Sequence, residues 1–569
     1  MLPESVLLSG FFIIKMFMRR LSCCLLALSL WAVSCKKGKP LLSEDKKTDP
    51  PVVNPPVVNP PENTTSLVYI NSANKLAYNK FANEGETNKD NVVPDFSNAG
   101  YKGGGVALPD VPVKKTISAI TGDNRLNIQN AIDEVKNMPA DANGIRGAVL
   151  LQAGTYEVEG TLLIDRSGVV LRGVGQGSNG TIIKATKKAQ HNLIEINGSG
   201  SGMPEVGGTR KKITTDYVAT GALTFDVESP AGFTIGDQIS VYRVPNQDWI
   251  NALDMAQYGW TAADYDVNFE RKITAINGNT ITLNAPIVDP IQTKYGGGYI
   301  FKTNISGRIS NSGVENIRLV SYYLNDDDEL HAWNAIELNR TENCWVKQVT
   351  AQYFGYACVS VSTMSVYNTI EECAMLDPKS QTTGSRKYSF NLEAGSSFNL
   401  FQRCYTRGGR HDYVTGSRVP GPNVFLDSYS TDTKADIGPH HRWATGVLFD
   451  NVFGGQIIVQ NRKAMGSGHG WAGAQTLFWN CKSSNYDIKV ESPKGAKNWG
   501  IGCVGQIKNG AGYWESWGTH VLPRSLYITQ LNERLGSVAV NNVTTPAQRA
   551  GSIHELLRVW AGEGKLGGQ

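Results

Sequence analysis

The chain has 569 residues, of which 41% are hydrophobic and 19% charged, and its formal net charge is +4. This composition is typical of a soluble globular protein, and so small a net charge gives no reason to expect a nucleic-acid partner. The length indicates either several domains or a repeat fold that grows along one axis. The 60 glycines and the 9% of aromatic residues favour an all-β protein with many turns.

The N-terminus has the pattern of a bacterial lipoprotein signal. Arg19 and Arg20 precede an apolar stretch over residues 21–33, which is too short to span a bilayer as a helix. The run Ala32-Val33-Ser34-Cys35 resembles a lipobox. We therefore expect residues 1–35 to be a signal peptide and Cys35 to carry a lipid. This lipid would anchor a secreted protein at the bacterial outer membrane, on its periplasmic or cell-surface side.

Residues 36–65 predict a tether between the lipid and the folded part. This stretch is rich in lysine and proline and repeats the unit Pro-Pro-Val-Val-Asn over residues 50–61. Such a composition gives an extended spacer that holds the folded part away from the membrane. Residues 66–112 follow as an N-terminal extension.

An amphipathic helix and a series of short strands occupy residues 120–183. The helix is predicted around residues 128–132, and apolar strands are predicted at 147–151, 162–164, 169–172 and 181–183, with glycine turns between them. The order of these pieces resembles the opening of pectate-lyase-like parallel β-helix proteins, in which a helix caps the first coils. The resemblance implies an all-β fold over residues 113–530, a right-handed single-stranded parallel β-helix with an N-terminal capping helix.

Residues 205–300 break the pattern and predict a β-rich insertion. Trp249, Tyr258 and Trp260 lie in it and could either stack on sugar rings or pack inside the insertion. Residues 531–569 form a C-terminal tail. Its helical spacing over residues 547–561 predicts a helix that packs against the solenoid or closes its C-terminal end.

A repeat can be counted from Gly313 onward. Small or polar residues recur at one inward position, every 22 to 31 residues, at Val349, Cys373, Cys404, Ser428, Asn451, Cys481 and Cys503. An interval of 22–24 residues fits one coil of a β-helix, and the longer intervals fit coils with longer loops. We predict at least six consecutive coils over residues 313–510, with the cysteines in an inward stack and not in disulfides.

Four of the eight histidines fall between residues 411 and 469, and each has an arginine, an aspartate or a tryptophan within two residues. Because adjacent coils stack about 4.8 Å apart, residues 20–30 positions apart can meet in one groove. The predicted catalytic residues are His411, His441, Tyr413, Arg442 and His469. The predicted substrate-binding residues are Arg386, Tyr388, Arg410, His440, Asn461, Arg462, Trp443 and Trp471.

This set of side chains suits an anionic sugar. Elimination at a uronic acid requires neutralisation of the C5 carboxylate, removal of the C5 proton and protonation of the leaving oxygen. Arginine pairs carboxylates, and histidine or tyrosine can exchange protons near neutral pH. We expect a polysaccharide lyase that acts as a monomer on a uronate glycan. His441 or His411 would accept the proton, Tyr413 or His469 would donate one, and Arg442 would bind the carboxylate.

Two other functions remain open from the sequence. Gly468-His469-Gly470 resembles a motif of polygalacturonase-like β-helix hydrolases, but the other motifs of those enzymes are missing. A different pair of carboxylates could serve a hydrolase, drawn from Asp412, Asp427, Asp432, Asp436 and Asp450. A non-catalytic, glycan-binding surface protein is the third hypothesis, which exposed aromatic residues along the solenoid would support.

The sequence predicts no definite cofactor. Asp326-Asp327-Asp328-Glu329 is a dense run of carboxylates before His331. Such a run is usually a solvated loop, and the alternative is a Ca²⁺ site.

Overall fold

The computed structural model describes residues 57–58, 65–200, 202–484 and 486–567. Contacts within the chain divide it into Met1–Pro51 and Val52–Gln569, and every element named below belongs to the second unit. The predicted signal peptide, the lipidation site Cys35 and most of the tether lie outside the described residues. Within the described part of the chain, none of the helices has both the length and the apolar composition needed to cross a membrane.

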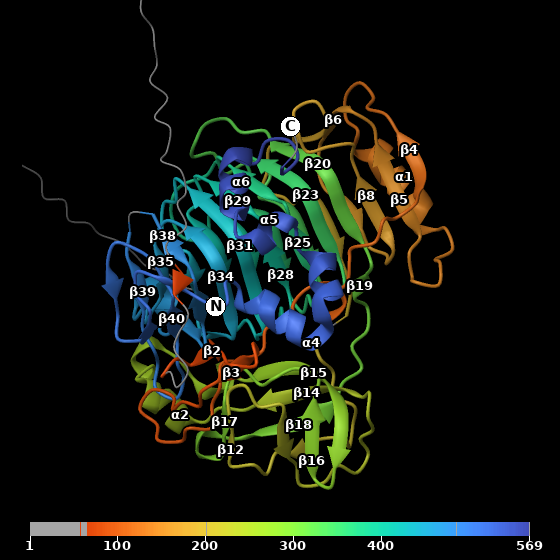
Figure 1. Cartoon of the computed structure of the whole chain (residues 1–569). Coiled ribbons are helices and arrows are strands. Elements are labelled where there is room, and N and C mark those ends of the chain that lie inside the picture. The colour runs from red at the N-terminus through yellow and green to blue at the C-terminus, as the bar shows by residue number, and fades with distance from the viewer. Residues whose placement is uncertain (1–56, 59–64, 201, 485, 568–569) are drawn as a thin grey trace, which may run out of the picture. The chain divides into compact units, whose positions relative to one another are not determined.

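The core is a parallel β-helix, as the sequence predicted (Figure 1). Each central coil contributes one strand to a first sheet and two short strands to a second sheet. The first sheet consists of β7 (Leu162–Ile164), β10 (Ile194–Asn197), β21 (Asn334–Asn339), β24 (Ala357–Ser362), β27 (Tyr388–Leu392), β30 (His411–Thr415) and β32 (Gly438–Pro439). All of its neighbouring strands pair in parallel.

The second sheet runs the length of the β-helix. Its early strands are β4 (Val113–Ile117), β5 (Gly147–Leu151), β6 (Gly154–Val158), β8 (Val169–Arg172), β9 (Thr181–Ala185), β20 (Gly313–Ser321) and β23 (Trp345–Gln352). Its later strands are β25 (Thr369–Glu371), β26 (Ala374–Leu376), β28 (Leu400–Gln402), β29 (Tyr405–Arg407), β31 (Asn423–Thr431), β34 (Val447–Gly454), β37 (Leu477–Trp479), β38 (Lys482–Ser483), β40 (Trp499–Ile501) and β42 (Tyr513–Glu515).

Short strands complete the later coils and their edges. They are β19 (Ile309–Ser310) with β22 (Thr341–Glu342), β33 (Ala444–Thr445) with β36 (Gly473–Ala474), and β35 (Ile457–Val459) with β39 (Ile488–Val490) and β41 (Lys508–Asn509). Strand β1 (Val57–Val58) pairs in parallel with β43 (His520–Val521), and β2 (Val68–Ile70) pairs with β3 (Leu76–Tyr78).

Stacked side chains hold the coils in register. Asn368 donates from its side-chain amide to Asn399, 31 residues later, and Asn399 donates to Asn423, 24 residues later. Such a ladder satisfies buried amides along the axis of the solenoid. Cys373, Cys404 and Cys481 point into the hydrophobic core, as predicted, and all cysteines of the described residues are free thiols.

One residue with positive φ bends each of five successive coils within the second sheet. Angles of 47° to 55° occur at Gln348, Glu372, Arg403, Asp427 and Asn451. The residue after each bend is buried in the interior, as Cys373 and Cys404 show. In the fifth of these coils the interior residue is therefore Val452. The sequence analysis placed Asn451 there, which is wrong by one residue, because the asparagine forms the bend.

Helices cover the first coils and one flank of the β-helix. Helix α1 (Arg125–Lys136) buries Ile128, Ile132 and Val135 against the first coils, as a cap should. The tail contains α4 (Leu526–Val543), which the sequence analysis missed, α5 (Pro546–Ala550) and α6 (Ile553–Trp560). These helices run back along the second sheet (Figure 1), where Trp560 packs near Tyr405. They flank the coils and do not close the C-terminal end.

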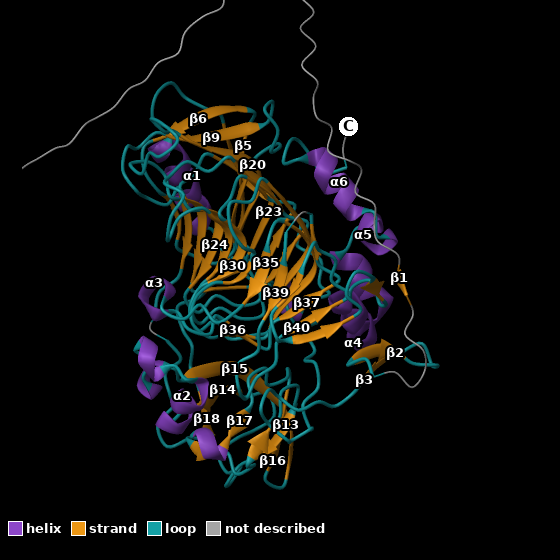
Figure 2. Cartoon of the chain, turned by 90° about the vertical axis from the view of Figure 1, so that its left-hand side faces the viewer, coloured by secondary structure: helices purple, strands orange, loops and turns teal. Residues whose placement is uncertain are grey.

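The predicted insertion consists of a six-stranded and a two-stranded antiparallel sheet and has its own hydrophobic core. Its strands are β11 (Lys211–Lys212), β12 (Tyr217–Val218), β13 (Thr224–Asp226), β14 (Gln238–Arg243), β15 (Val267–Asn277), β16 (Thr280–Leu283), β17 (Ile291–Gln292) and β18 (Gly298–Lys302). Helix α2 (Gln247–Leu253) belongs to it and lies on the same side of the molecule as α3 (Met465–Gly468) (Figure 2). The insertion thus contacts the coils that carry the histidines.

Candidate functional site

A pocket of about 610 Å³ lies beside the ends of β27, β30 and β32, next to the loop that contains α3. Many of the predicted catalytic and substrate-binding residues line this pocket. Its titratable and cationic lining residues are Tyr388, Arg410, His440, His441, Arg442, Arg462 and His469. Gly384, Ser385, Ser417, Gly466 and Ser467 form the rest of its wall.

Parallel stacking of coils explains why these residues meet. Tyr388 begins β27 and His411 begins β30, and the two residues are direct partners in the strand register. In the next coil β32 pairs with the end of β30, and His440 and His441 follow it immediately. Residues from three successive coils therefore surround one pocket, with Tyr388 at the start of its strand and His440 just beyond the end of its own.

The loop that carries His469 is held by two anchors. Trp260 of the insertion donates from Nε1 to the Gly468 carbonyl at 3.0 Å. Arg442 donates to the same carbonyl from Nε at 3.3 Å and to the Ser467 hydroxyl from Nη2 at 3.1 Å. Gly466 has a φ of 64°, and a Cβ there would lie 2.2 Å from His469 Nε2, so only glycine permits this position of the ring.

The imidazoles of the cluster are neutral near pH 7. Burial lowers the pKa of His440 and His441 to about 3 and that of His411 and His469 to about 4. The arginine side chains nearby lower these pKa values further, since a second positive charge beside them is unfavourable. Each neutral ring retains one nitrogen lone pair that can accept a proton or bind a metal ion.

Two guanidinium groups are available to an anion. Arg410 Nη1 and Arg462 Nε are buried and have no hydrogen-bond partner among the described residues. Buried donors of this kind usually bind something in the functional state. Arg442 uses its donors to hold the loop, so the predicted role of carboxylate partner fits Arg410 and Arg462 better.

Asp436 lies behind the pocket wall. Its carboxylate oxygens are 3.6 Å from His411 Nδ1 and 3.9 Å from both His440 Nδ1 and Arg462 Nη1. Burial alone would raise the pKa of Asp436, but His440, His411 and Arg462 outweigh that effect and hold it well below its usual range. The carboxylate is thus ionised, and it offsets part of the positive charge of the cluster. The sequence analysis considered Asp436 only as a hydrolase carboxylate.

Tyr413 is a correction to the predicted site. Its side chain is fully buried in the β-helix core, stacked on Phe390, and its hydroxyl donates to the backbone carbonyls of Cys404 and Tyr429. It does not reach the pocket. Residue His411 is also only 1% exposed and lies behind His440, with 3.9 Å between ring centroids.

Four predicted binding residues also lie outside the pocket lining. Trp443 is buried against Trp249 and donates to Asp289, and Trp471 packs in the same aromatic cluster. Arg386 forms a two-point ion pair with Glu329. The sequence showed their proximity in the chain but not the direction of their side chains.

Asn461 is the fourth of these residues. Its side chain accepts from the backbone N–H of Lys463 and shapes the turn that follows. The pocket residues that the sequence analysis missed, Ser385, Ser417 and Ser467, carry no pattern that distinguishes them from other loop serines.

The other acidic candidates are engaged elsewhere. Asp427 pairs with Arg524, and Asp450 accepts hydrogen bonds from Ser525 and from the backbone of Tyr527, so both hold the start of α4. In the run 326–329, one end pairs with Lys379 and the other with Arg386. The residues that could hold a metal ion, among those described, are instead His440 with His441 and His469, and His411 with Asp436 and His440.

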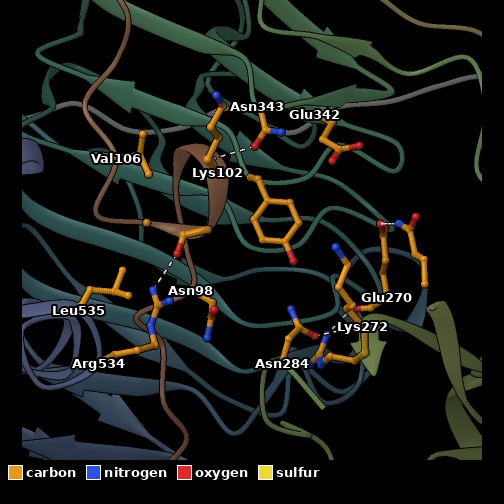
Figure 3. Close-up of a pocket in the computed structure, with 15 residues that line it drawn as sticks. Asn98, Lys102, Val106, Glu270, Lys272, Asn284, Glu342, Asn343, Arg534 and Leu535 are labelled. Carbon is orange, nitrogen blue, oxygen red and sulfur yellow. Dashed lines mark hydrogen bonds between the residues drawn. The ribbon is translucent and has the colours of Figure 1, made fainter. Parts of the chain in front are cut away.

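A larger pocket of about 680 Å³ lies between the N-terminal extension, the insertion and α4 (Figure 3). The polar groups around it are largely paired with one another. Asn343 accepts from the backbone of Lys102, Arg534 donates to the Gly103 carbonyl, and Glu270 forms a buried ion pair with Arg308. Among the described residues, no histidine lines this pocket. Its lining residues come from the N-terminal extension, the insertion, the β-helix and α4, which meet at this place.

Comparisons with known proteins give weak structural likenesses. No protein family model matches the chain, and no curated protein matches its sequence. The tailspike protein gp49 of Pseudomonas phage LKA1 aligns over 70% of both chains, with 12% identity and a TM-score of 0.37.

Two further tailspike structures give similar values. The Gp54 tailspike of Acinetobacter baumannii bacteriophage AP22, solved in complex with capsular saccharide, aligns over 69% of this chain and 70% of its own, with 9% identity and a TM-score of 0.28. A mutant tailspike protein of E. coli bacteriophage HK620, in complex with pentasaccharide, aligns over 70% of this chain and 56% of its own, with 11% identity and a TM-score of 0.38. Identities and TM-scores this low say nothing about the chemistry of the pocket.

Proposed function

We propose that the protein is a polysaccharide lyase that cleaves a uronate-containing glycan by β-elimination in the pocket of Tyr388 and His441. One observation carries this proposal: three arginines and three neutral histidines line a single pocket whose lining, among the described residues, contains no carboxylate. Such a pocket attracts a carboxylate and can still accept a proton.

The geometry supports a division of roles. Arg410 and Arg462 would bind the sugar carboxylate with their unpartnered donors and stabilise the enolate-like charge that develops when C5 loses its proton. His441 would accept that proton. A bound carboxylate would raise the pKa of His441, because an opposite charge favours the protonated ring. His469 lies beside it, with 4.7 Å between ring centroids.

In this proposal Tyr388, and not Tyr413, protonates the leaving oxygen. Its ring centroid lies 6.0 Å from that of His441, and burial raises the pKa of its hydroxyl, which therefore retains its proton near neutral pH. C5 and the carbon that bears the leaving oxygen are adjacent in the sugar. The acid and the base would therefore act on neighbouring atoms of the bound sugar.

A hydrolase fits this pocket less well. Glycosidic hydrolysis proceeds through an oxocarbenium-like state that requires two carboxyl groups at the scissile bond. Asp436 lies behind the wall, and Asp412 is fully buried and bonded to Ser389. A purely binding groove would require exposed aromatic platforms, whereas Trp443 and Trp249 are buried.

The test is digestion of a panel of pectin, alginate and glycosaminoglycans, followed by ultraviolet absorbance of the unsaturated product. We expect absorbance to rise on at least one uronate polysaccharide and to stay flat on neutral glycans. Arg462→Ala should lower kcat/KM at least a hundredfold, since a charge-assisted bond to the transition state is lost.

The matched control is Arg386→Ala, which removes an arginine of the same strand region that pairs with Glu329 outside the pocket. It should retain activity within about threefold, because surface ion pairs contribute little. Cleavage in labelled water that places heavy oxygen at the new reducing end, with no absorbing product, would show hydrolysis and refute the proposal.

A further inference from the structure

Three buried ligand groups converge behind the wall of the pocket. The residues His411, Asp436 and His440 are 1%, 8% and 3% exposed, and one ligand atom from each lies within 4.8 Å of the other two. They come from two successive coils, with His411 at the start of β30 and the others on either side of β32. The rigid stacking of the coils therefore fixes their spacing.

Each of the three carries a buried polar atom without a partner. His411 Nε2, Asp436 Oδ2 and His440 Nδ1 have no hydrogen-bond partner among the described residues. Buried polar atoms are nearly always paired, and an unpaired one requires an explanation such as a water molecule or an ion. Three of them in one place, on two imidazoles and one carboxylate, form the donor set that divalent transition metals prefer.

The other ring nitrogen of His411 already contacts a backbone carbonyl. His411 Nδ1 lies 2.7 Å from the backbone carbonyl of Asp436, which acts as acceptor if that nitrogen carries the proton. Histidines that bind metal ions usually donate their other ring N–H to such a carbonyl. The contact would leave Nε2, the unpartnered atom, with the free lone pair.

We infer that His411, Asp436 and His440 form a site for one divalent transition-metal ion such as Zn²⁺. In a tetrahedral zinc site, with bonds of about 2.0–2.1 Å, ligand atoms stand roughly 3.3 Å apart. The 3.9 Å between Asp436 Oδ2 and His440 Nδ1 approaches that value, and a ligand atom of His411 lies within 4.8 Å of the ligand atoms of the other two residues. The inference does not depend on the proposed reaction.

Charge is the main argument against a cation here, and the structure partly offsets it. Arg462 Nη1 lies 3.9 Å from Asp436 Oδ2, and Arg410 is also near. The carboxylate of Asp436 would place one negative charge directly on the ion. Because His440 also lines the pocket, the ion would lie beneath its wall, where a bound sugar carboxylate would balance the charge.

The test uses the whole protein after treatment with a chelator and needs no glycan. Calorimetric titration with Zn²⁺ should show one ion per chain. His411→Ala and Asp436→Asn should each weaken binding at least tenfold, whereas the control His191→Ala should not, because His191 lies on another coil with its Nδ1 against the Ala189 carbonyl.

A second measurement remains decisive if a variant does not fold. X-ray absorption of the Zn²⁺-loaded wild-type protein should show two imidazole ligands and a carboxylate. Absence of binding would overturn the inference, as would a spectrum with three imidazoles, which would place the ion at His440, His441 and His469. Because binding is measured without substrate, loss of the lyase proposal would leave this result intact, and the reverse also holds.

Discussion

Two tyrosines that lie on adjacent strands of the first sheet differ in what their side chains face, a pocket in one case and the core in the other. Tyr388 begins β27 and lines the pocket, whereas Tyr413 lies within β30 and points into the core. The hydroxyl of Tyr413 is fixed by two backbone carbonyls. Its place in the fold makes it a matched control for Tyr388.

We predict that Tyr388→Phe abolishes turnover and leaves the fold intact. The change removes only the hydroxyl that would protonate the leaving oxygen, so kcat should fall by about 10²-fold to 10⁴-fold with little change in KM. Tyr413→Phe should retain kcat per folded molecule but should lower the free energy of unfolding by about 1–2 kcal/mol, since two buried carbonyls lose their donor. Steady-state kinetics and chemical denaturation measure both. Equal losses of kcat in the two variants would contradict the assignment.

The sequence placed the cluster correctly but not the direction of individual side chains. Counting coils was enough to bring Tyr388, Arg410 and His441 together, because strand stacking converts sequence spacing into distance. Whether a residue faces the core or the groove depends on where the bend of each coil falls. That position was not readable for Tyr413, nor for Trp443, which a tryptophan from the insertion covers.

At the scale of elements, the insertion supports the loop that carries His469. The indole of Trp260 bonds to Gly468 next to His469, and Trp249 packs against Trp443 beneath the same loop. The sequence analysis left open whether these tryptophans stack on sugars or pack inside the insertion. Both are almost fully buried, so packing is their observed role.

We predict that Trp260→Phe impairs the pocket more than Trp249→Phe does. Both changes remove part of a buried indole, but only the first removes the hydrogen bond to the Gly468 carbonyl, a bond of about 1 kcal/mol. The loop with Ser467 and His469 should become less ordered, and kcat/KM should fall roughly fivefold to tenfold at a similar melting temperature. Kinetics and thermal denaturation of both variants test this. Indistinguishable kinetics would mean that packing alone fixes the loop.

The position of the bend within each coil could not be predicted from the sequence repeat. Five successive bends carry five different side chains, those of glutamine, glutamate, arginine, aspartate and asparagine. Any of these residues can adopt a positive φ when hydrogen bonds to its side chain offset the cost of that backbone conformation. Glu372, for example, accepts hydrogen bonds from Gln348 and Arg403. No residue type therefore signals the bend, and Asn451 was misplaced by one position.

At the scale of the whole molecule, the C-terminal helices are fastened to the β-helix by buried acidic groups. Asp450 of β34 accepts from Ser525 and Tyr527 at the start of α4, and Asp427 of β31 pairs with Arg524. Burial raises the pKa of Asp450 to about 7, and the charge of Asp427 adds to the effect, while the bond from Ser525 opposes it. Folding thus favours the protonated form of this carboxyl group.

The last prediction is that the protein loses stability as the pH rises through about 7. A carboxyl group with a raised pKa in the folded state contributes stability at acidic pH, below its unfolded pKa of about 3.9, and that contribution disappears above its folded pKa. Buried Asp412, with a pKa of about 6, acts in the same direction. The buried histidines, such as His554 with a folded pKa of about 4, act in the opposite direction up to their unfolded pKa of about 6.5, so the loss of stability is expected above that pH.

Thermal denaturation from pH 5 to pH 9 measures this dependence. Above about pH 6.5 the wild-type melting temperature should fall, and Asp450→Asn should flatten the fall, because an amide can accept the same two hydrogen bonds without becoming charged. The free energies of unfolding of the two proteins should differ at pH 9 by a few kcal/mol, since each unit of pKa shift corresponds to about 1.4 kcal/mol. Asp432→Asn changes an exposed carboxylate one residue beyond β31 and should leave the slope as it is. If Asp450→Asn melts with the wild-type slope, the carboxyl group is ionised throughout and Arg524, which faces both acidic groups, neutralises the pair.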